Sequence, residues 1–121
     1  MSTEPGSRVG VIYDGDPFTK IVEFLGYGVY SGDEVPVGAV GFMAETLLKL
    51  KHVSQKITLD SGEVVYGCEC WWGGEAKAKQ NIEDYKKQGY EIKVISVAEA
   101  RKRMKKANEE DEKEEEETNA G

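Results

Sequence analysis

The residues that could do chemistry gather in one stretch of this sequence, 64–75, which reads VVYGCECWWGGE. It holds both cysteines and both tryptophans of the chain: Cys68, Cys70, Trp71 and Trp72. The cysteines, with Glu69 and His52, could supply ligands for a metal such as zinc. A structural zinc site uses four ligands in paired clusters, whereas this chain has two cysteines and one histidine. We therefore expect core thiols, with no metal site.

Covalent catalysis finds little support in the same residues. A cysteine nucleophile needs a lowered thiol pKa and an oriented base, and a lone histidine on a distant segment indicates neither. No Walker lysine and no G-x-G-x-x-G pattern occurs in the chain. We therefore expect a protein that is no enzyme and carries no cofactor. The short C-x-C spacing disfavours a disulfide, so we expect Cys68 and Cys70 to be free thiols.

Aromatic side chains are the stronger candidates for binding. Residues 63–72 alternate as a strand, which would place Trp72 on one face with both cysteines and Trp71 on the other. Rings on neighbouring strands can stack on nucleobases, and they can equally fill a core or an interface. The candidate set is Tyr27, Tyr30, Tyr66, Trp71 and Trp72. Core or interface packing is favoured for the tryptophans, while glycines beside Tyr27 and Tyr30 leave these rings more open.

Cationic candidates lie on two predicted helices. Arg101 falls in the second turn of the last helix, beside its apolar stripe, where a guanidinium could grip a phosphate. Lys49 and His52 lie near the end of an earlier helix. Cationic side chains there interact favourably with the negative end of the helix dipole, and they could also bind a phosphate. The basic residues around Arg101 could instead balance the acidic residues that follow them.

Hydrophobic periodicity and turn chemistry predict the elements that position these residues. Glycines at 26 and 28 interrupt a strand pattern, which suggests a bulge or a close backbone approach. Asp60-Ser61-Gly62 predicts a three-residue hairpin loop, and Ser96 with Glu99 predicts a capping box. The expected strands are 8–13, 20–25, 57–59, 63–72 and 90–97, and the expected helices are 42–53, 75–88 and one that begins at Ser96.

This order predicts an α+β fold. An N-terminal antiparallel sheet with a short inserted helix is followed by helix, strand and helix at the C-terminus. A chain of 121 residues has room for one domain, which we assign to residues 1–106. Residues 107–121 carry eight acidic side chains against one lysine, and they predict a disordered acidic tail.

Composition narrows the partners and the location. The first 106 residues carry 15 basic and 15 acidic side chains, so the acidic net charge belongs to the tail and a dedicated duplex-DNA binder is not expected. No apolar run approaches the length of a membrane helix, and the N-terminus lacks a signal-peptide core. We expect a soluble cytoplasmic protein that binds no membrane and no nucleic acid.

Three segments together carry a resemblance: GYGVYSGDEVP at 26–36, ITLDSGEVVYGCECWWGGE at 57–75, and the closing V-x-x-A-R at 97–101. Over residues 20–104, the chain resembles small phage-borne proteins of the Thoeris anti-defence family. The resemblance implies an N-terminal antiparallel sheet followed by helices. It also implies sequestration, without chemistry, of a cyclic ADP-ribose-type nucleotide made by bacterial TIR-domain enzymes. A phage-encoded protein would act in the cytoplasm of the host cell.

The leading hypothesis is therefore a homo-oligomer, a dimer or larger, that sequesters a cyclic nucleotide between aromatic rings and cationic groups. The predicted ligand-binding residues are Tyr27, Tyr30, Trp71, Trp72, Arg101, Lys49 and His52. The alternative hypothesis is a protein–protein inhibitor or adaptor of a host enzyme. It would use the tryptophan strand as its anchor and the acidic tail as a nucleic-acid mimic.

Overall fold

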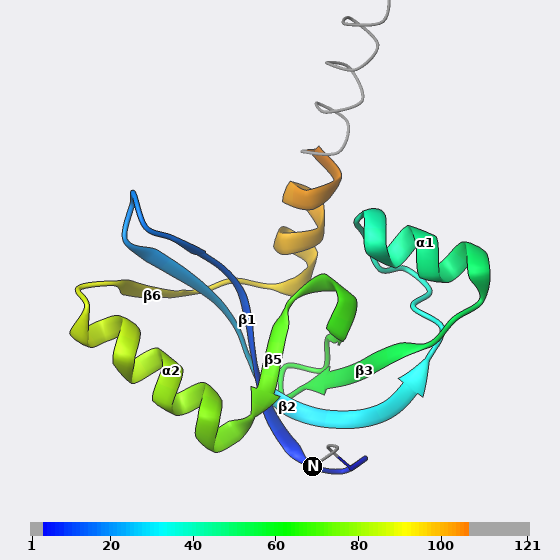
Figure 1. Cartoon of the computed structure of the whole chain (residues 1–121), viewed down its shortest axis with the longest axis horizontal. Coiled ribbons are helices and arrows are strands. Elements are labelled where there is room, and N and C mark those ends of the chain that lie inside the picture. Colours follow the sequence, from blue (N-terminus) through cyan, green and yellow to red (C-terminus); the bar gives the residue numbers. More distant parts are fainter. Residues whose placement is uncertain (1–3, 107–121) are drawn as a thin grey trace, which may run out of the picture.

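The longest strand, β2 (Ile21–Glu34), is the axis of the fold. The computed structural model describes residues 4–106. On one edge, β2 pairs antiparallel with β1 (Arg8–Asp16). On its other edge, it pairs antiparallel with β3 (Ser54–Leu59) and, nearer its start, parallel with β6 (Glu91–Val94) (Figure 1). One strand thus joins the N-terminal and C-terminal parts of the chain.

The segment predicted as one strand, 63–72, forms two strands separated by a turn, so that prediction is wrong. β4 (Val64–Tyr66) pairs with β3 through the expected three-residue hairpin loop. The 3₁₀ turn η1 (Gly67–Glu69) then redirects the chain, and β5 (Trp71–Gly74) pairs with β1 at the far side of the sheet. The order of the main path is β4-β3-β2-β1-β5. The alternation inferred from residue 64 to residue 72 therefore does not hold.

Gly67, the first residue of the turn η1 between β4 and β5, is tightly packed. A Cβ atom at Gly67 would lie 2.3 Å from Oε1 of Gln55 and 2.7 Å from Nε1 of Trp72. No larger residue fits at this position unless those side chains move. A glycine that looked like part of a strand is thus the point at which the chain leaves one edge of the sheet for the other.

The glycines within β2 behave as predicted. Gly26 has a φ of 128°, and the β1–β2 register shifts opposite it, between Val11 and Ile12. Gly28 is a place of close approach, because a Cβ there would lie 2.4 Å from the carbonyl oxygen of Thr58. These features let β2 continue through the glycines and curve, so it is longer than the predicted strand of 20–25.

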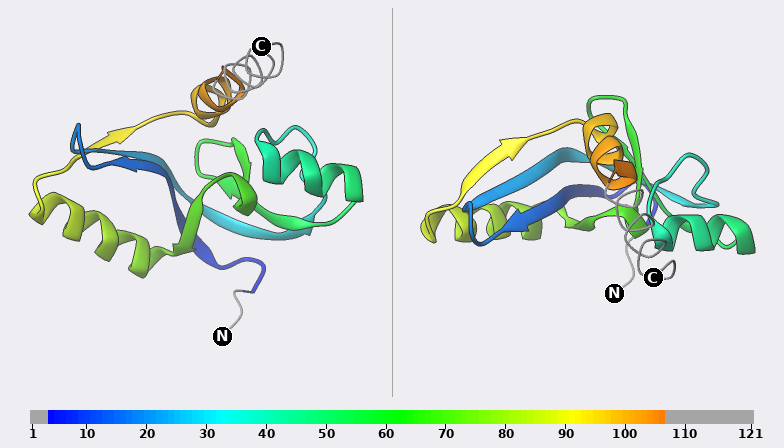
Figure 2. Two further views of the ribbon diagram at one scale, coloured as in Figure 1. Left: turned by 45° about the horizontal axis from the view of Figure 1, so that its top comes forward. Right: turned by 90° about the horizontal axis from the view of Figure 1, so that it is seen from above.

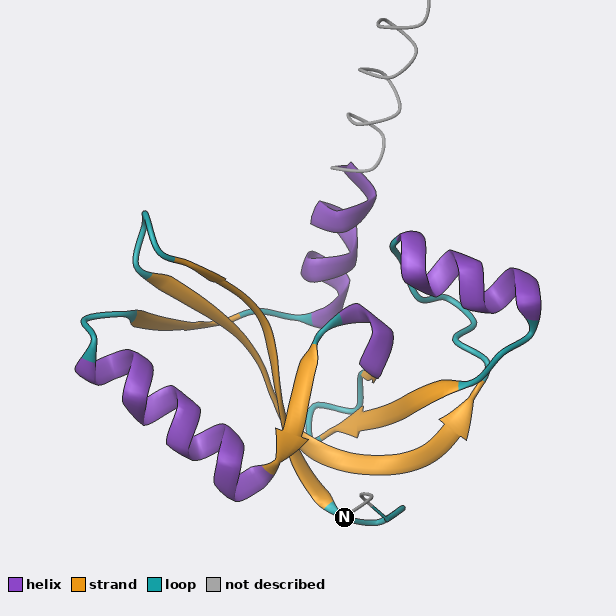
Figure 3. Cartoon of the chain, viewed as in Figure 1, coloured by secondary structure: helices purple, strands orange, loops and turns teal. Residues whose placement is uncertain are grey.

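Within residues 4–106, three helices complete the α+β fold that was predicted, and Figure 3 distinguishes them from the sheet. α1 (Phe42–Leu50) ends three residues before the predicted end, and Lys51, the residue after it, has a left-handed conformation. α2 (Glu75–Lys87) is followed by Gly89 with a φ of 88°, as expected for the residue after a helix. The C-terminal helix spans 97–106 within the described chain. The predicted acidic tail, 107–121, lies outside the described residues.

Side chains from the sheet form two apolar clusters. The larger is buried with the start of the C-terminal helix, and its members are Val9, Val11, Leu25, Tyr30, Ile57, Leu59, Val65, Ile95, Val97 and Ala100. The smaller cluster includes Ile82 of α2, and its sheet members are Ile12, Val22 and Phe24. Figure 2 shows α2 and the C-terminal helix on different sides of β1 and β2. The two faces of the sheet are thus covered by different helices.

The C-terminal helix has a cap assembled from two parts of the chain. Oγ of Ser96 accepts a hydrogen bond from the backbone N–H of Glu99, which is one half of the predicted capping box, while the carboxylate of Glu99 pairs with Arg103. The other free N–H groups of the first turn, those of Val97 and Ala98, donate to the carboxylate of Glu63 in the β3–β4 hairpin. This hairpin therefore sets where the helix begins. No helix within residues 4–106 is long and apolar enough to cross a membrane.

Candidate binding site

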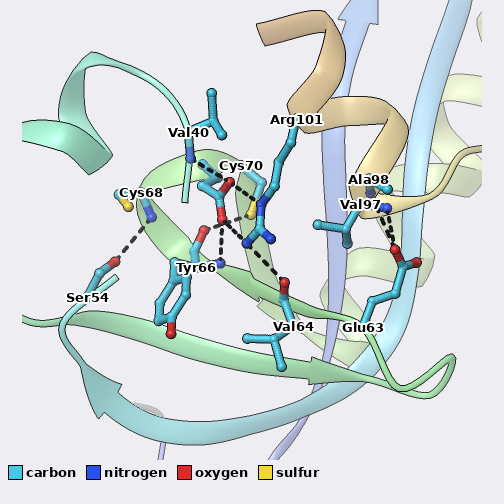
Figure 4. Close-up of polar contacts among 11 residues, drawn as sticks. Val40, Ser54, Glu63, Val64, Tyr66, Cys68, Cys70, Val97, Ala98 and Arg101 are labelled. Atoms are coloured by element: carbon cyan, nitrogen blue, oxygen red, sulfur yellow. Dashed lines mark hydrogen bonds and ion pairs between the residues drawn. The ribbon is translucent and has the colours of Figure 1, made fainter. Parts of the chain in front are cut away.

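Arg101, the predicted phosphate contact, is held by Glu69 (Figure 4). Its Nε and Nη2 donate to the two carboxylate oxygens at 3.0 and 2.9 Å, and Nη2 also donates to the carbonyl of Val64 at 3.1 Å. The same carboxylate accepts the backbone N–H groups of Tyr66 and Val40. We call this arrangement the Glu69–Arg101 clasp. It joins η1, the C-terminal helix and the loop before α1.

The clasp leaves little room for a ligand. The cavity beside it has a volume of about 10 Å³, close to the space that one water molecule needs. Hydrogen bonding to Glu69 raises the pKa of Arg101, although partial burial opposes that shift. A phosphate contact from Arg101 stays a prediction, and it would require the clasp to open.

Tyr30 and Trp72 pack against each other. Their rings stack with centroids 5.5 Å apart and planes 16° apart, and Tyr30 is buried in the larger apolar cluster. The hydroxyl of Tyr30 donates to Asp33. A nucleobase could stack on either ring only after this pair separated. Tyr30 is therefore not the open ring that its neighbouring glycines suggested, and core packing, the favoured alternative for Trp72, describes both rings.

Tyr27 is more shielded than its neighbouring glycines suggested. Its ring meets Phe24 edge to face at 5.0 Å, and Nζ of Lys79 in α2 lies 5.6 Å from the ring centroid. A Cβ atom at Gly10 would come within 3.2 Å of the ring, so β1 also lies close. Strand and helix thus cover a ring that sequence reasoning expected to be open.

Lys49 and His52 are exposed at the end of α1. Figures 1 and 2 show α1 and α2 at opposite ends of the molecule, so these cationic residues lie far from Tyr27 and Trp71. The seven predicted binding residues are therefore not gathered at one place. Among the predicted aromatic residues, Trp71 borders an open hollow.

This hollow lies between β1, β5 and α2. It has a volume of about 280 Å³, near the lower end of the range for small-molecule pockets. A second hollow, of about 410 Å³, continues along α2 and shares Asn81 and Tyr85 with the first. We call the two together the aromatic trough. Its lining residues are Ile12, Tyr13, Asp14, Gly15, Trp71, Asn81, Asp84, Tyr85 and Gln88.

Local packing holds the ring of Trp71 at the trough. A Cβ atom at Gly73 would lie 3.0 Å from the outer edge of the indole, so the ring lies over a glycine that has no side chain to displace it. Trp71 is nevertheless 39% exposed. Asn81 and Tyr85 are one helical turn apart and face the same hollow from α2. A planar group entering the trough beside Trp71 would meet the rings of Trp71 and Tyr85 and the amide of Asn81.

The polar groups of the trough favour hydrogen-bond donors in a ligand. Asp14 and Asp84 supply carboxylates, and no lysine or arginine lines either hollow. One oxygen of Asp14 accepts the N–H of Gly15, which leaves further acceptor capacity on the carboxylate. Burial, followed by the charge of Asp14, raises the pKa of Tyr13, and its hydroxyl donates to the carbonyl of Ala100 in the C-terminal helix at 3.2 Å, so this group is already engaged away from the trough. The lining therefore suits a ring that carries N–H groups and disfavours a phosphate.

Sequence reasoning missed Tyr13, Asp14, Asn81 and Tyr85 as site residues. Asn81 and Tyr85 are four positions apart, a spacing that is typical of two residues on one helix face. No pattern in the sequence showed that this face would lie beside Trp71. That neighbourhood depends on β5 pairing with β1.

Both cysteines are free thiols, as predicted. Burial raises the pKa of Cys70 to about 12, and the nearby carboxylate of Glu69 acts in the same direction. Its thiol donates to the carbonyl of Tyr66 at 3.4 Å. Because the thiolate is the reactive form, Cys70 is expected to be inert in the folded protein at neutral pH. Within residues 4–106, no group of three or more His, Cys, Asp or Glu side chains is placed to hold a metal ion.

The pKa of Cys70 predicts a loss of stability at alkaline pH. The unfolded chain releases this proton near its ordinary pKa of 9.0, while the folded chain keeps it until about pH 12. Between these values the folded state binds more protons, so the free energy of unfolding should fall as pH rises, by up to about 1.4 kcal/mol per pH unit. Urea unfolding of wild type and Cys70→Ala at pH 8 and pH 10 isolates this contribution. An equal pH dependence in the two proteins would contradict it.

Comparison with protein-family models, curated proteins and solved structures found no match to this chain.

Proposed function

We propose that this protein is a binding module that holds the base of a nucleotide in the aromatic trough and performs no chemistry on it. The observation that carries the proposal is the partly exposed ring of Trp71 beside Tyr85 and Asn81 at an open hollow. Stacking on an aromatic ring is available to every base and contributes about 1–3 kcal/mol per base. The amide and carboxylate groups of the trough would then orient the base through its ring edge.

The resemblance to Thoeris anti-defence proteins makes a cyclic ADP-ribose-type nucleotide the proposed ligand, and sequestration the proposed consequence. An adenine base carries an exocyclic amino group, and the carboxylate of Asp14 or Asp84 could accept a hydrogen bond from it. The carboxylates repel phosphate, so the pyrophosphate would lie outside the trough. Sequestration requires affinity and slow release, and it requires no catalytic group.

The direct test is binding of defined nucleotides to the full chain. Calorimetry and thermal-shift measurements would compare cyclic ADP-ribose isomers with cyclic dinucleotides, cyclic trinucleotides and linear ADP-ribose. A ligand that binds only the folded protein raises the melting temperature as its concentration increases. Recovery of unchanged nucleotide after heat denaturation would support sequestration. Recovery of a hydrolysed product would contradict the absence of chemistry.

Replacing Trp71 by alanine should weaken binding about tenfold or more, because the stacking surface is lost. Phe18→Ala is the matched control, since Phe18 is an exposed ring that lines no part of the trough. Tryptophan fluorescence in a Trp72→Phe variant reports on Trp71 alone, and it should change when the ligand binds. Equal affinity of Trp71→Ala and wild type would place the ligand elsewhere.

The inhibitor or adaptor hypothesis is the second proposal. In this hypothesis the partly exposed Trp71 is the anchor for the partner, because Trp72 stacks against Tyr30. Truncation before Ala107 tests the other part of this hypothesis, namely mimicry of nucleic acid by the acidic residues. Loss of biological activity on truncation, with nucleotide binding unchanged, would favour the inhibitor. Retained activity would exclude mimicry by that segment.

A further inference from the structure

α1 presents a stripe of large apolar side chains to solvent. Phe42, Met43 and Leu50 are 82%, 58% and 60% exposed, and Ala44 is the one residue of the helix that is buried. Two more apolar residues, Val37 and Val53, are exposed close to the ends of the helix. Such a grouping is unusual on the surface of a monomer, because exposed apolar residues normally occur singly.

Helical periodicity places Phe42, Met43 and Leu50 on one face. At 100° per residue, Phe42, Thr46 and Leu50 fall in one row, and Met43 lies beside that row. Ala44 points to another side, toward the body of the protein. Figures 1 and 2 show α1 at one end of the molecule, far from α2. The stripe is thus exposed on the side of α1 that lies opposite the buried Ala44.

The apolar area of this face is that of a functional surface patch. Phe42, Met43 and Leu50 with these exposures present on the order of 350 Å² of apolar surface, within the range of the largest patch on a monomer. One partner in a standard interface buries about 800 Å², so the stripe would supply the apolar centre of one subunit's contribution and its polar border would supply the rest.

We propose that this stripe is a self-association surface, on which two copies pack α1 against α1 in antiparallel orientation. Charge placement selects a second copy as the occupant. Glu45 and Lys49 lie one turn apart along one border of the stripe. A two-fold axis at the level of Leu47 would bring Glu45 of each copy opposite Lys49 of the other, so the same patch is complementary to itself.

The side chains at the centre suit a close approach of two helices. Thr46 is small, and its hydroxyl donates to the carbonyl of Phe42 at 2.8 Å, which leaves its methyl group for the contact. In this antiparallel arrangement, Met43 of each copy lies near Leu50 of the other. The interface is independent of the proposed nucleotide site, because α1 and the aromatic trough lie at opposite ends of the molecule. Each subunit of the dimer keeps its trough open.

The first experiment measures the mass of the full chain by sedimentation equilibrium over a range of concentrations. Wild type should form a dimer, and Met43→Glu/Leu50→Glu should be monomeric with an unchanged circular dichroism spectrum, because both side chains are exposed in the monomer. A wild-type protein that stays monomeric at hundred-micromolar concentration would overturn the proposal. So would a dimer that the double substitution leaves intact.

Charge exchange tests the antiparallel two-fold arrangement. Glu45→Lys and Lys49→Glu should each weaken the dimer about tenfold, because each change replaces two attractive pairs by two repulsive ones. The double exchange should restore association, and a mixture of the two single variants should form heterodimers. Failure of the double exchange to restore the dimer would overturn this arrangement. Binding of monomers to phosphatidylserine vesicles, lost in Met43→Glu/Leu50→Glu, would assign the stripe to a membrane and also overturn the proposal.

Discussion

Glu69→Ala is expected to lower the free energy of unfolding by about 3–5 kcal/mol. The side chain of Glu69 is only 6% exposed, and its carboxylate accepts hydrogen bonds from Arg101, Tyr66 and Val40. Removing it would leave a partly buried guanidinium without its carboxylate and two backbone N–H groups without their acceptor. The clasp joins three segments that are distant in sequence, so all three should loosen together.

Urea unfolding of the variants measures this effect. Glu83→Ala is the control, because Glu83 pairs with Lys86 on the exposed face of α2, and such surface pairs contribute less than about 1 kcal/mol. A double-mutant cycle with Arg101→Ala should give a large coupling energy, since the second substitution removes the stranded charge. If Glu69→Ala unfolds at the same urea concentration as Glu83→Ala, the clasp does not stabilise the fold.

The clasp also affects how Arg101 should be tested as a ligand contact. Arg101→Ala removes a structural partner of Glu69, so weaker nucleotide binding in that variant could follow from destabilisation alone. The melting temperature of the unliganded variant must therefore be measured beside its affinity. Reduced affinity in a variant as stable as wild type would support the predicted phosphate contact.

Gly28→Ala is expected to destabilise the protein by about 3 kcal/mol. The added Cβ atom would lie 2.4 Å from the carbonyl oxygen of Thr58 and 2.7 Å from the Cα atom of Leu59. Both are backbone atoms of β3, so the clash can be relieved only by moving that strand away from β2. β4 pairs with β3 and would be displaced with it.

The control for this prediction is Gly15→Ala, at a position within β1 where an added Cβ would meet Cγ2 of Val22 at an ordinary contact distance of 3.7 Å. Both substitutions reduce the backbone entropy of the unfolded chain in the same way, so their difference reports the steric clash. Thermal unfolding gives the size of the effect. Hydrogen exchange should show the loss of protection in β3 and β4. Equal stability of the two variants would show that β2 and β3 can separate without cost.

The sequence by itself determined the features that depend on neighbouring residues. The α+β class, the three-residue loop that ends in Gly62, the end of α2 at Gly89 and the cap at Ser96 were all predicted and are all present. Each depends on propensities and hydrogen bonds within a few residues. The bulge at Gly26 belongs to the same group, because a positive φ is a property of one residue and its backbone.

Only the tertiary structure decided where β5 lies. The alternation of residues 63–72 fits one continuous strand, yet the chain turns at η1 and β5 pairs with β1. Pairing with β1 places Trp72 against Tyr30 and leaves Trp71 at the aromatic trough. Local alternation cannot choose between two sheet edges, because both offer free backbone hydrogen-bonding groups.

The partner of Arg101 was decided in the same way. Its residue type and helix position are compatible with a phosphate, and the sequence contains nothing that pairs it with a carboxylate 32 positions earlier. Folding brings Glu69 into reach because η1 turns back toward the C-terminal helix. A partly buried cation is costly unless it is paired. The carboxylate of Glu69 therefore pairs with Arg101, in the place where the sequence predicted the phosphate of a ligand.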